Sequence, residues 1–474
     1  MTSRSARNAS RRSGSAAAMY SSTVTAFSCT RFPFGAPRRL CVSLARSQTG
    51  DVELEAVSKR RSRVVVAGAF VSGLLGLAAA VAPALAPRSA DAARAVAPLR
   101  VARPLPQWLA PGAATTVTGW AASGEQVRVL AGRQVLGRTR AGRLGRFALR
   151  LRAPTQTRRY ELVLRGAERE RPLPSLLVRP VVLAAVGDVN LGDATATAIR
   201  SYGSNYPWTS AAPVLRAADL AVANLECAVS TRGTPAAKLY TFRGDPPAVA
   251  GLQKAGIDVV SLANNHSLDY GVEAFVDTMR HLRRAGVSVA GGGKDLAAAR
   301  KPAIVEAGGL RLAIFGYSDV RPAGFDASDD RPGAARAEIG AITTDIRNAR
   351  RRGETVVVYF HWGTERAQTP DARQRSFATA ALDAGATVVL GAHPHVLQPV
   401  ELTGRRLLAW SLGNFVFAAH SPETSTTGVL TAGLDARGVR WSDLIPATIS
   451  GVRPLLREER KRQALLRLAA PKSL

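Results

Sequence analysis

Apolar and polar positions divide this chain into segments of different kinds. From residue 181 to about residue 418, short apolar runs alternate with stretches of helical periodicity, which is typical of a layered α/β domain with a largely parallel sheet. Six runs are predicted to be buried strands: 181–187, 219–224, 257–263, 311–317, 355–360 and 386–391. Four segments are predicted to be helices: 246–255, 271–285, 336–351 and 371–384. Because 398–411 and 428–441 lack helical periodicity, we expect this domain, at 181–450, to close with antiparallel strands.

Residues 97–179 show short alternating segments separated by Gly, Pro and Ser. Four of these segments are predicted to be strands: 115–119, 126–130, 146–151 and 160–164. Strands of this length with turns between them predict a small β-sandwich. The order of the segments loosely resembles that of immunoglobulin-like modules of exported bacterial proteins, through Gly119-Trp120 and Gly145-Arg146-Phe147.

Two further segments flank these domains. Pro172, Pro174 and Pro180 are predicted to form a short, stiff linker between the β-module and the α/β domain. Residues 451–474 are predicted to form a basic, amphipathic C-terminal tail.

The first 92 residues are expected to lie outside the folded domains. Residues 1–57 are rich in Ser, Ala and Arg and predict a disordered tail. In segment 58–92, basic residues precede an uncharged apolar run, 64–82, which describes either a cleaved export signal or a membrane anchor. A signal at this position also suggests that the natural start of translation lies further downstream. Either interpretation predicts an exported protein of the cell envelope, membrane-anchored or secreted.

The charge balance indicates an anionic partner. The chain has 64 Lys and Arg against 35 Asp and Glu, a net charge of +29 at pH 7, which favours contact with a lipid surface, an acidic polymer or a phosphorylated substrate. Between residues 100 and 179 there are 16 Arg and four Glu. This excess of arginine indicates one of two things: a surface that binds a polyanion or a membrane, or a solvated basic face. Nucleic acid is not expected as a partner, because export separates the protein from it and no aromatic residues interleave with the basic ones.

Cysteine usage limits the chemistry of any metal site. Cys227 is the only cysteine outside residues 1–57. One cysteine cannot form an intramolecular disulfide or a thiolate metal site. Any metal must therefore be held by oxygen and nitrogen atoms.

Polar side chains collect where the predicted strands end. Five of the six strands run into a carboxylate, an amide or an imidazole, and the residues concerned are Asp188, Asn190, Glu226, Asn265, His266, Asp269, His361, His393 and His395. The carboxyl ends of parallel strands meet at one edge of a sheet, where open α/β sheets place their sites. This ligand set suits divalent metals such as Mn, Fe, Zn or Mg. Because the set exceeds the needs of one ion, it predicts a pair of metals sharing a carboxylate, a geometry that suits phosphoryl hydrolysis.

An ordered set of motifs resembles a known family. The motifs are Gly187-Asp188-Val189-Asn190-Leu191, Asn224-Leu225-Glu226, Asn264-Asn265-His266 with Asp269, His361-Trp362-Gly363, Gly391-Ala392-His393-Pro394-His395 with Gln398, and Ser411-Leu412-Gly413-Asn414-Phe415. Over residues 181–420 this set resembles the CapA family of capsule or poly-γ-glutamate synthesis proteins, which are related to the calcineurin-like metallophosphoesterases. The resemblance implies a four-layered α/β/β/α sandwich with a two-metal centre, occupied by Mn, Fe or Zn, at the strand ends.

The resemblance also implies roles for the residues that would hold the metals. Glu226 would be the bridging carboxylate. One metal would be held by Asn265, His361 and His393, and the other by Asp188 and His395. Asn190 stands where phosphoesterases usually have a histidine ligand, which leaves the second metal with fewer ligands.

Other residues would act on the substrate. His266, assisted by Asp269, would protonate a leaving group or stabilise the transition state. Ser411 and Asn414 either line the pocket or form a turn that closes the sheet. Arg243 either binds a substrate carboxylate or phosphate bidentately or is an ordinary surface residue.

These observations favour two hypotheses about function. The first is metal-dependent hydrolysis, with phosphoester cleavage as its most concrete form, in the synthesis of an anionic cell-surface polymer. The second is a non-catalytic scaffold or polymer-binding component of a membrane synthesis complex. The expected partners are the polymer or a phosphorylated small molecule, together with the membrane surface or that complex.

Overall fold

The computed structural model describes residues 98–473. The predicted segments 1–57 and 58–92, with their export signal or anchor, lie outside the described residues. Within residues 98–473, no helix combines the length and the apolar character needed to cross a membrane.

Residues 100–178 form two β-sheets. The first sheet has the strand order β1 (Arg100–Val101), β3 (Ala114–Trp120) and β6 (Arg146–Arg152). The second has the order β2 (Trp108–Leu109), β8 (Glu170–Val178), β7 (Arg158–Arg165), β4 (Gln126–Ala131) and β5 (Gln134–Arg140). Along β6, the exposed Arg146, Ala148, Arg150 and Arg152 alternate with the buried Phe147, Leu149 and Leu151. This period of two places one face of the strand in the core and the other in solvent. The four predicted strands are present, and the immunoglobulin-like assignment stays a prediction.

The predicted proline linker is wrong for two of its three residues. Pro172 and Pro174 lie inside β8, where Pro172 is opposite Val163 of β7. On its other side β8 pairs with β2 only at residues 177 and 178, so this part of the strand is an edge. Proline is tolerated at a sheet edge, because its missing N–H would have faced solvent.

The α/β region contains two large sheets. The first has the order β14 (Ser288–Ala290), β13 (Val259–Ser261), β10 (Leu220–Leu225), β9 (Val181–Val189), β24 (Thr426–Asp435), β25 (Gly438–Ser450) and β26 (Arg453–Leu456), with β23 (Asn414–Val416) also paired to β9. The second has the order β16 (Ala303–Ala307), β17 (Leu310–Ser318), β19 (Thr355–His361), β20 (Val388–Ala392), β22 (Arg406–Ala409) and β21 (Val400–Thr403). Two short ladders join β11 (Ala228–Val229) to β12 (Arg243–Gly244) and β15 (Gly292–Gly293) to β18 (Gly333–Ala334).

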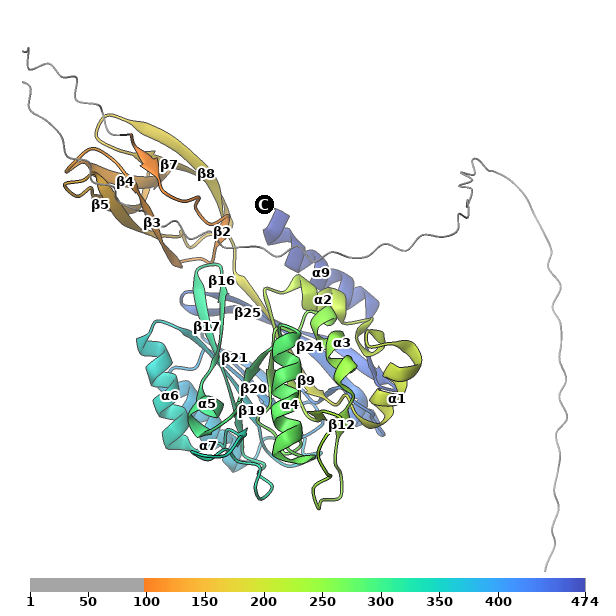
Figure 1. Cartoon of the computed structure of the whole chain (residues 1–474). Helices are drawn as coiled ribbons and strands as arrows, with labels where there is room; N and C mark the ends of the chain where they lie inside the picture. Colours follow the sequence, from red (N-terminus) through yellow and green to blue (C-terminus); the bar gives the residue numbers. More distant parts are fainter. Residues whose placement is uncertain (1–97, 474) are drawn as a thin grey trace, which may run out of the picture. The chain divides into compact units, whose positions relative to one another are not determined.

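Helices cover the outer faces of both sheets (Figure 1). Those on the first sheet are α1 (Asp193–Tyr202), η1 (Tyr206–Trp208), α2 (Ala212–Ala217), η2 (Pro246–Ala248), α3 (Val249–Ala255), α4 (Gly271–Arg284) and α9 (Glu458–Ser473). Those on the second sheet are α5 (Leu296–Arg300), α6 (Ile339–Arg351) and α7 (Ala372–Ala384), while α8 (Pro422–Ser425) precedes β24. The order of layers is therefore helix, sheet, sheet, helix, and the predicted mixed α/β class is confirmed.

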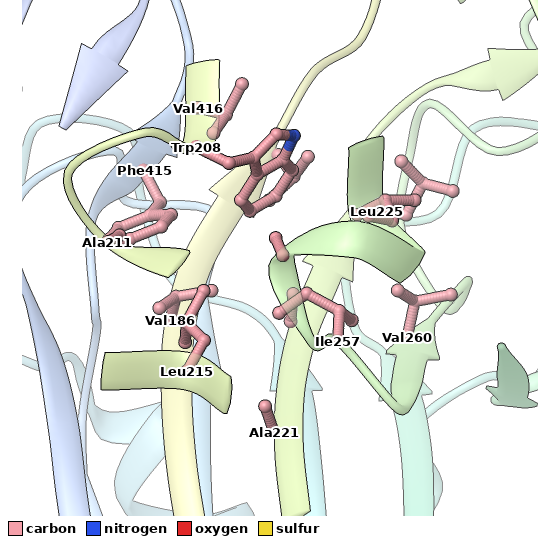
Figure 2. Packing of buried hydrophobic residues seen from close by; sticks show 14 of the residues in the cluster. Val186, Trp208, Ala211, Leu215, Ala221, Leu225, Ile257, Val260, Phe415 and Val416 are labelled. Atoms are coloured by element: carbon pink, nitrogen blue, oxygen red, sulfur yellow. The ribbon is translucent and has the colours of Figure 1, made fainter. Parts of the chain in front are cut away.

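Alternate residues of each central strand enter different cores. Leu183 of β9 and Val357 of β19 lie in the core between the two sheets. Val186 of β9 faces the helices, in a core that includes the fully buried Trp208 and Phe415 (Figure 2). Burial on both faces explains why these strands are continuous apolar runs in the sequence.

The C-terminal segment differs from the predicted tail. Residues 453–456 form β26 of the first sheet, and α9 buries Ala464 and Leu468 in the core of that layer. Leu466 of the same helix is exposed, as are Arg462 and Arg467. The segment is therefore part of the α/β domain.

Candidate metal centre

The carboxyl ends of the central strands bring the predicted residues together. Parallel register places Asn224 of β10 beside Asp188 of β9, and Asn414 of β23 pairs with the same Asp188. In the second sheet His361 ends β19 opposite Ala392 of β20, directly before His393. Both sheets therefore deliver polar side chains to one place, as open α/β sheets commonly do.

Glu226 lies at the centre of this group. Its side chain is fully buried, and Oε1 is 3.3 Å from His361 Nε2 and 3.9 Å from His395 Nε2. Among the described residues, neither carboxylate oxygen of Glu226 has a hydrogen-bond partner. A buried carboxylate without hydrogen bonds is costly unless a cation compensates it.

Two ligand groups share Glu226. The first combines Glu226 with His361 and His393, and the second combines it with Asp188 and His395; within each group the ligand atoms lie within 4.8 Å of one another. The resemblance implied the same division, with Asn265 added to the first group, and the assignment of these residues to two metals stays a prediction.

Burial and charge set the protonation of the site. Burial raises the pKa of Glu226 well above its ordinary value, and the nearby Asp188 carboxylate raises it further. Burial lowers the pKa of His361 well below its ordinary value and lowers that of His393 to about 3. Burial opposes a charge on His395 too, but attraction to Glu226 and Asp188 outweighs it and raises the pKa of His395 to about 10. His361 and His393 are thus neutral imidazoles, the form that binds metals.

The residues present fit a divalent metal. Carboxylate oxygens and imidazole nitrogens without thiolate are the donors that Mn, Fe and Zn accept. The unpartnered oxygens of Glu226 are the observation that such an ion would explain.

Asparagines hold the ligands in place. Asn224 Nδ2 donates a hydrogen bond to Asp188 Oδ1 at 2.8 Å and lies 3.2 Å from His361 Nδ1. Asn264 Nδ2 in turn donates to Asn224 Oδ1 at 3.1 Å. Asn265 Oδ1 lies 2.6 Å from His361 Nε2, so its oxygen reaches the first ligand group. Such contacts around the ligands orient them.

His266 and Asp269 form a buried pair beside this group. His266 Nδ1 lies 2.7 Å from Asp269 Oδ2, and Phe242 stacks on the imidazole at 4.1 Å between ring centroids. Burial lowers the pKa of His266, against the hydrogen bond to Asp269 that raises it. Lys238, which the sequence analysis did not single out, completes the arrangement: its Nζ is 2.6 Å from Asp269 Oδ1 and donates to the carbonyl oxygen of Asn265 at 2.6 Å.

The predicted substrate-binding residues have three different environments. Ser411 is buried in a turn, where its Oγ donates to the carbonyl oxygen of Val396 at 2.7 Å, so the structure favours the turn interpretation. Asn414 Oδ1 is 2.9 Å from His395 Nδ1 and therefore orients a candidate ligand. Arg243 is exposed, with its guanidinium over the Tyr270 ring at 4.2 Å.

Asn190 does not present its amide as the motifs implied. Its Oδ1 accepts a hydrogen bond from the backbone N–H of Gly192 at 2.7 Å, and its Nδ2 donates to Asp193 Oδ2 at 3.3 Å. These bonds close a tight turn in which Asp193 has a positive φ of 48°. The amide is used by this turn, so the expectation of a ligand at Asn190 is not supported by the geometry.

Glu365 is a residue of the site that sequence reasoning missed. It forms a third ligand group with His393 and His395. Its position four residues after His361, in a loop rather than at a strand end, gave no periodic signal. Lys238 was missed for a similar reason, because it is 27 and 31 residues before Asn265 and Asp269 in the sequence.

Comparison with known proteins places the chain in a family. Residues 182–419 match the model of the family described as "Bacterial capsule synthesis protein PGA_cap". The chain is 30% identical over 272 residues to the PGA biosynthesis protein CapA of Bacillus subtilis (strain 168), covering 57% of this chain and 72% of that protein. It is 29% identical over 311 residues to the capsule biosynthesis protein CapA of Bacillus anthracis, covering 64% and 74%. The chain therefore belongs to the bacterial capsule synthesis protein family.

Solved structures show a distant likeness. A sulfate thiohydrolase, SoxB, of Thermus thermophilus aligns with a TM-score of 0.36 at 14% identity, covering 62% of this chain and 60% of that structure. The NAD nucleotidase of Haemophilus influenzae aligns with a TM-score of 0.32 at 12% identity, covering 62% and 56%.

Proposed function

We propose that this protein acts in the synthesis of a capsule or poly-γ-glutamate-type anionic polymer at the cell envelope, as a hydrolase with two divalent metal ions. Family membership supports the pathway. The two ligand groups that share Glu226 support the number of ions. Mn, Fe and Zn are the candidates, because the donors are carboxylates and imidazoles.

The proposed reaction is cleavage of a phosphoester by water. Metal ions held by the two ligand groups would lower the pKa of a bound water and neutralise charge on the attacked group. The new bond joins the water oxygen to phosphorus, and the bond between phosphorus and the ester oxygen breaks. The attacking water gives up a proton to solvent. His266, in its protonated form, would donate a proton from Nε2 to the leaving oxygen, because Nδ1 is engaged by Asp269.

Phe242 and Lys238 would maintain the geometry for this proton transfer. The stacked Phe242 ring limits rotation of the imidazole, and Lys238 holds Asp269 and the Asn265 carbonyl in fixed positions. Holding the acid in a fixed orientation lowers the activation free energy of proton transfer, because the entropy of orienting it is lost before the reaction begins.

The observation that carries the proposal is the buried, unpartnered carboxylate of Glu226 between three histidines. The test measures hydrolysis of bis(p-nitrophenyl) phosphate and p-nitrophenyl phosphate by the full chain with MnCl₂, together with metal content. His361→Ala should lose both metal and hydrolysis, whereas His281→Ala, on helix α4, should retain both. The proposal would be contradicted if the metal-free protein hydrolysed neither ester after addition of Mn²⁺, Fe²⁺ or Zn²⁺.

A second candidate function is a scaffold or polymer-binding component of a membrane synthesis complex. The observation that favours it is Asn190, whose amide is used within a turn. The arginines of the β-module would then contact the polymer or the membrane surface. A scaffold should tolerate His361→Ala in cells, whereas a hydrolase should not, provided that the variant is folded.

A further inference from the structure

The loop after β19 carries an exposed carboxylate, Glu365, to the outer side of the metal centre. The loop leaves the strand at His361, turns at Gly363, where φ is 84°, and reaches helix α7 at residue 372. Glu365 is exposed, while the histidines that it approaches are buried or nearly so.

Backbone and side-chain hydrogen bonds fix the position of this loop. The N–H of Arg366 donates to the carbonyl oxygen of Pro394 at 2.7 Å, which ties the residue after Glu365 to the turn between His393 and His395. Gln398 Nε2 donates to the carbonyl oxygen of Ala367 at 2.8 Å. Arg366 has a φ of 61°, a conformation that costs energy for a residue with a side chain. The loop is therefore held against the histidine turn by the two residues that directly follow Glu365.

The ligand atoms converge. Glu365, His393 and His395 each offer one ligand atom, and these atoms lie within 4.8 Å of one another. Only 5% of His393 is exposed, and its Nδ1 has no hydrogen-bond partner among residues 98–473. A buried imidazole nitrogen without a partner points to an absent ligand, since such groups are normally satisfied.

The turn at Asn190 leaves the second ligand group with three protein ligands. The second ligand group consists of Asp188, Glu226 and His395, and the amide of Asn190 does not add to it. Three protein ligands leave a position open on a four-coordinate ion.

We propose that Glu365 is a further ligand of the metal centre, reaching it from the loop side together with His393 and His395. This assignment rests on the proposed metal centre. It places one exposed side chain, on a loop, among ligands that the strand ends otherwise supply.

The test is titration of the metal-free full chain with MnCl₂. Binding is measured by calorimetry and by the electron paramagnetic resonance signal of free Mn²⁺. Glu365→Gln should weaken binding of one of the two equivalents by 10-fold or more, comparable to or larger than losses seen for groups around metal ligands. Glu365→His should recover most of this loss, since an imidazole can bind the ion without a negative charge. Glu161→Gln is the matched control, because it removes the charge of an exposed glutamate on β7.

The possible outcomes separate the two proposals. If the wild type and Glu365→Gln bind Mn²⁺ equally well, the assignment of Glu365 is overturned and the metal centre is not. Equal losses in Glu365→Gln and Glu365→His would show an effect of charge and would also overturn it. Wild-type protein that binds no Mn²⁺ would overturn the metal centre itself.

Discussion

Glu226 Oε1 lies 3.3 Å from His361 Nε2, and neither side chain is exposed to solvent. The two residues come from different sheets: Glu226 follows β10 of the first, and His361 ends β19 of the second. The centre therefore depends on how the two sheets pack, and a bound ion should hold them together.

Metal binding should stabilise the fold. A ligand that binds only the native state raises the free energy of unfolding by about 2.7 kcal/mol at a concentration 100 times its dissociation constant. We expect MnCl₂ to raise the thermal unfolding midpoint of the wild-type chain and to have little effect on Glu226→Gln. Scanning calorimetry with MnCl₂ or with EDTA measures this, with Glu161→Gln as a control that should respond like the wild type. An equal rise in Glu226→Gln would contradict the role of Glu226.

Lys238 should act as a positioning residue for hydrolysis. Its Nζ lies 2.6 Å from Asp269 Oδ1 and 2.6 Å from the carbonyl oxygen of Asn265. Lys238→Met should lower kcat by about 10- to 100-fold with KM and metal content unchanged, because the misplaced acid affects the transition state more than binding. Steady-state kinetics and elemental analysis of the same preparation check this. Loss of metal from Lys238→Met would instead indicate a structural role.

Gly187 should not tolerate a side chain. A Cβ at this position would lie within the contact distance of the Gly413 carbonyl oxygen, which accepts a hydrogen bond from Asp188 N. Gly187→Ala should lower the free energy of unfolding by about 2 kcal/mol or more, since a buried backbone would have to shift. Gly340→Ala in α6 is the matched control: a Cβ there meets nothing, so it should raise stability by about 0.5–1 kcal/mol. Urea denaturation measures both, and equal effects of the two variants would contradict the prediction.

Stability should depend on pH through Asp277. Its carboxylate accepts hydrogen bonds from Arg232 Nε at 2.8 Å and from Ser230 Oγ at 2.9 Å. The bonds with Arg232 hold the pKa of Asp277 well below its ordinary value. The native state therefore binds fewer protons at this group than the unfolded state, so the contribution is complete above about pH 5 and is lost as the pH falls.

Arg232→Gln tests this dependence. Between about pH 5 and pH 3, the free energy of unfolding should fall less steeply in Arg232→Gln than in the wild type. Urea denaturation at the two pH values gives both slopes. Arg200→Gln, which removes an exposed pair with Asp245, should keep the wild-type slope, and identical slopes in all three proteins would contradict the prediction.

Local pattern in the sequence determined much of the fold. Strands buried on both faces, such as β9 and β19, are continuous apolar runs, and helices α4, α6 and α7 agree with their predicted ranges to within three residues at either end. Helix α1 was not predicted. Pro172 and Pro174 of β8 were predicted to belong to a linker, because proline is usually excluded from strands. The strand tolerates them because this part of it is a sheet edge.

The sequence by itself determined which residues stand at the strand ends, because the ends of apolar runs can be located without tertiary structure. It therefore predicted Asp188, Glu226, His361, His393 and His395 as one group. Only the tertiary structure brings them into contact, since Glu226 and His361 belong to different sheets. It also decided that the Asn190 amide closes a turn and that the Glu365 loop lies over the histidines, because hydrogen bonds between residues distant in sequence leave no periodic pattern.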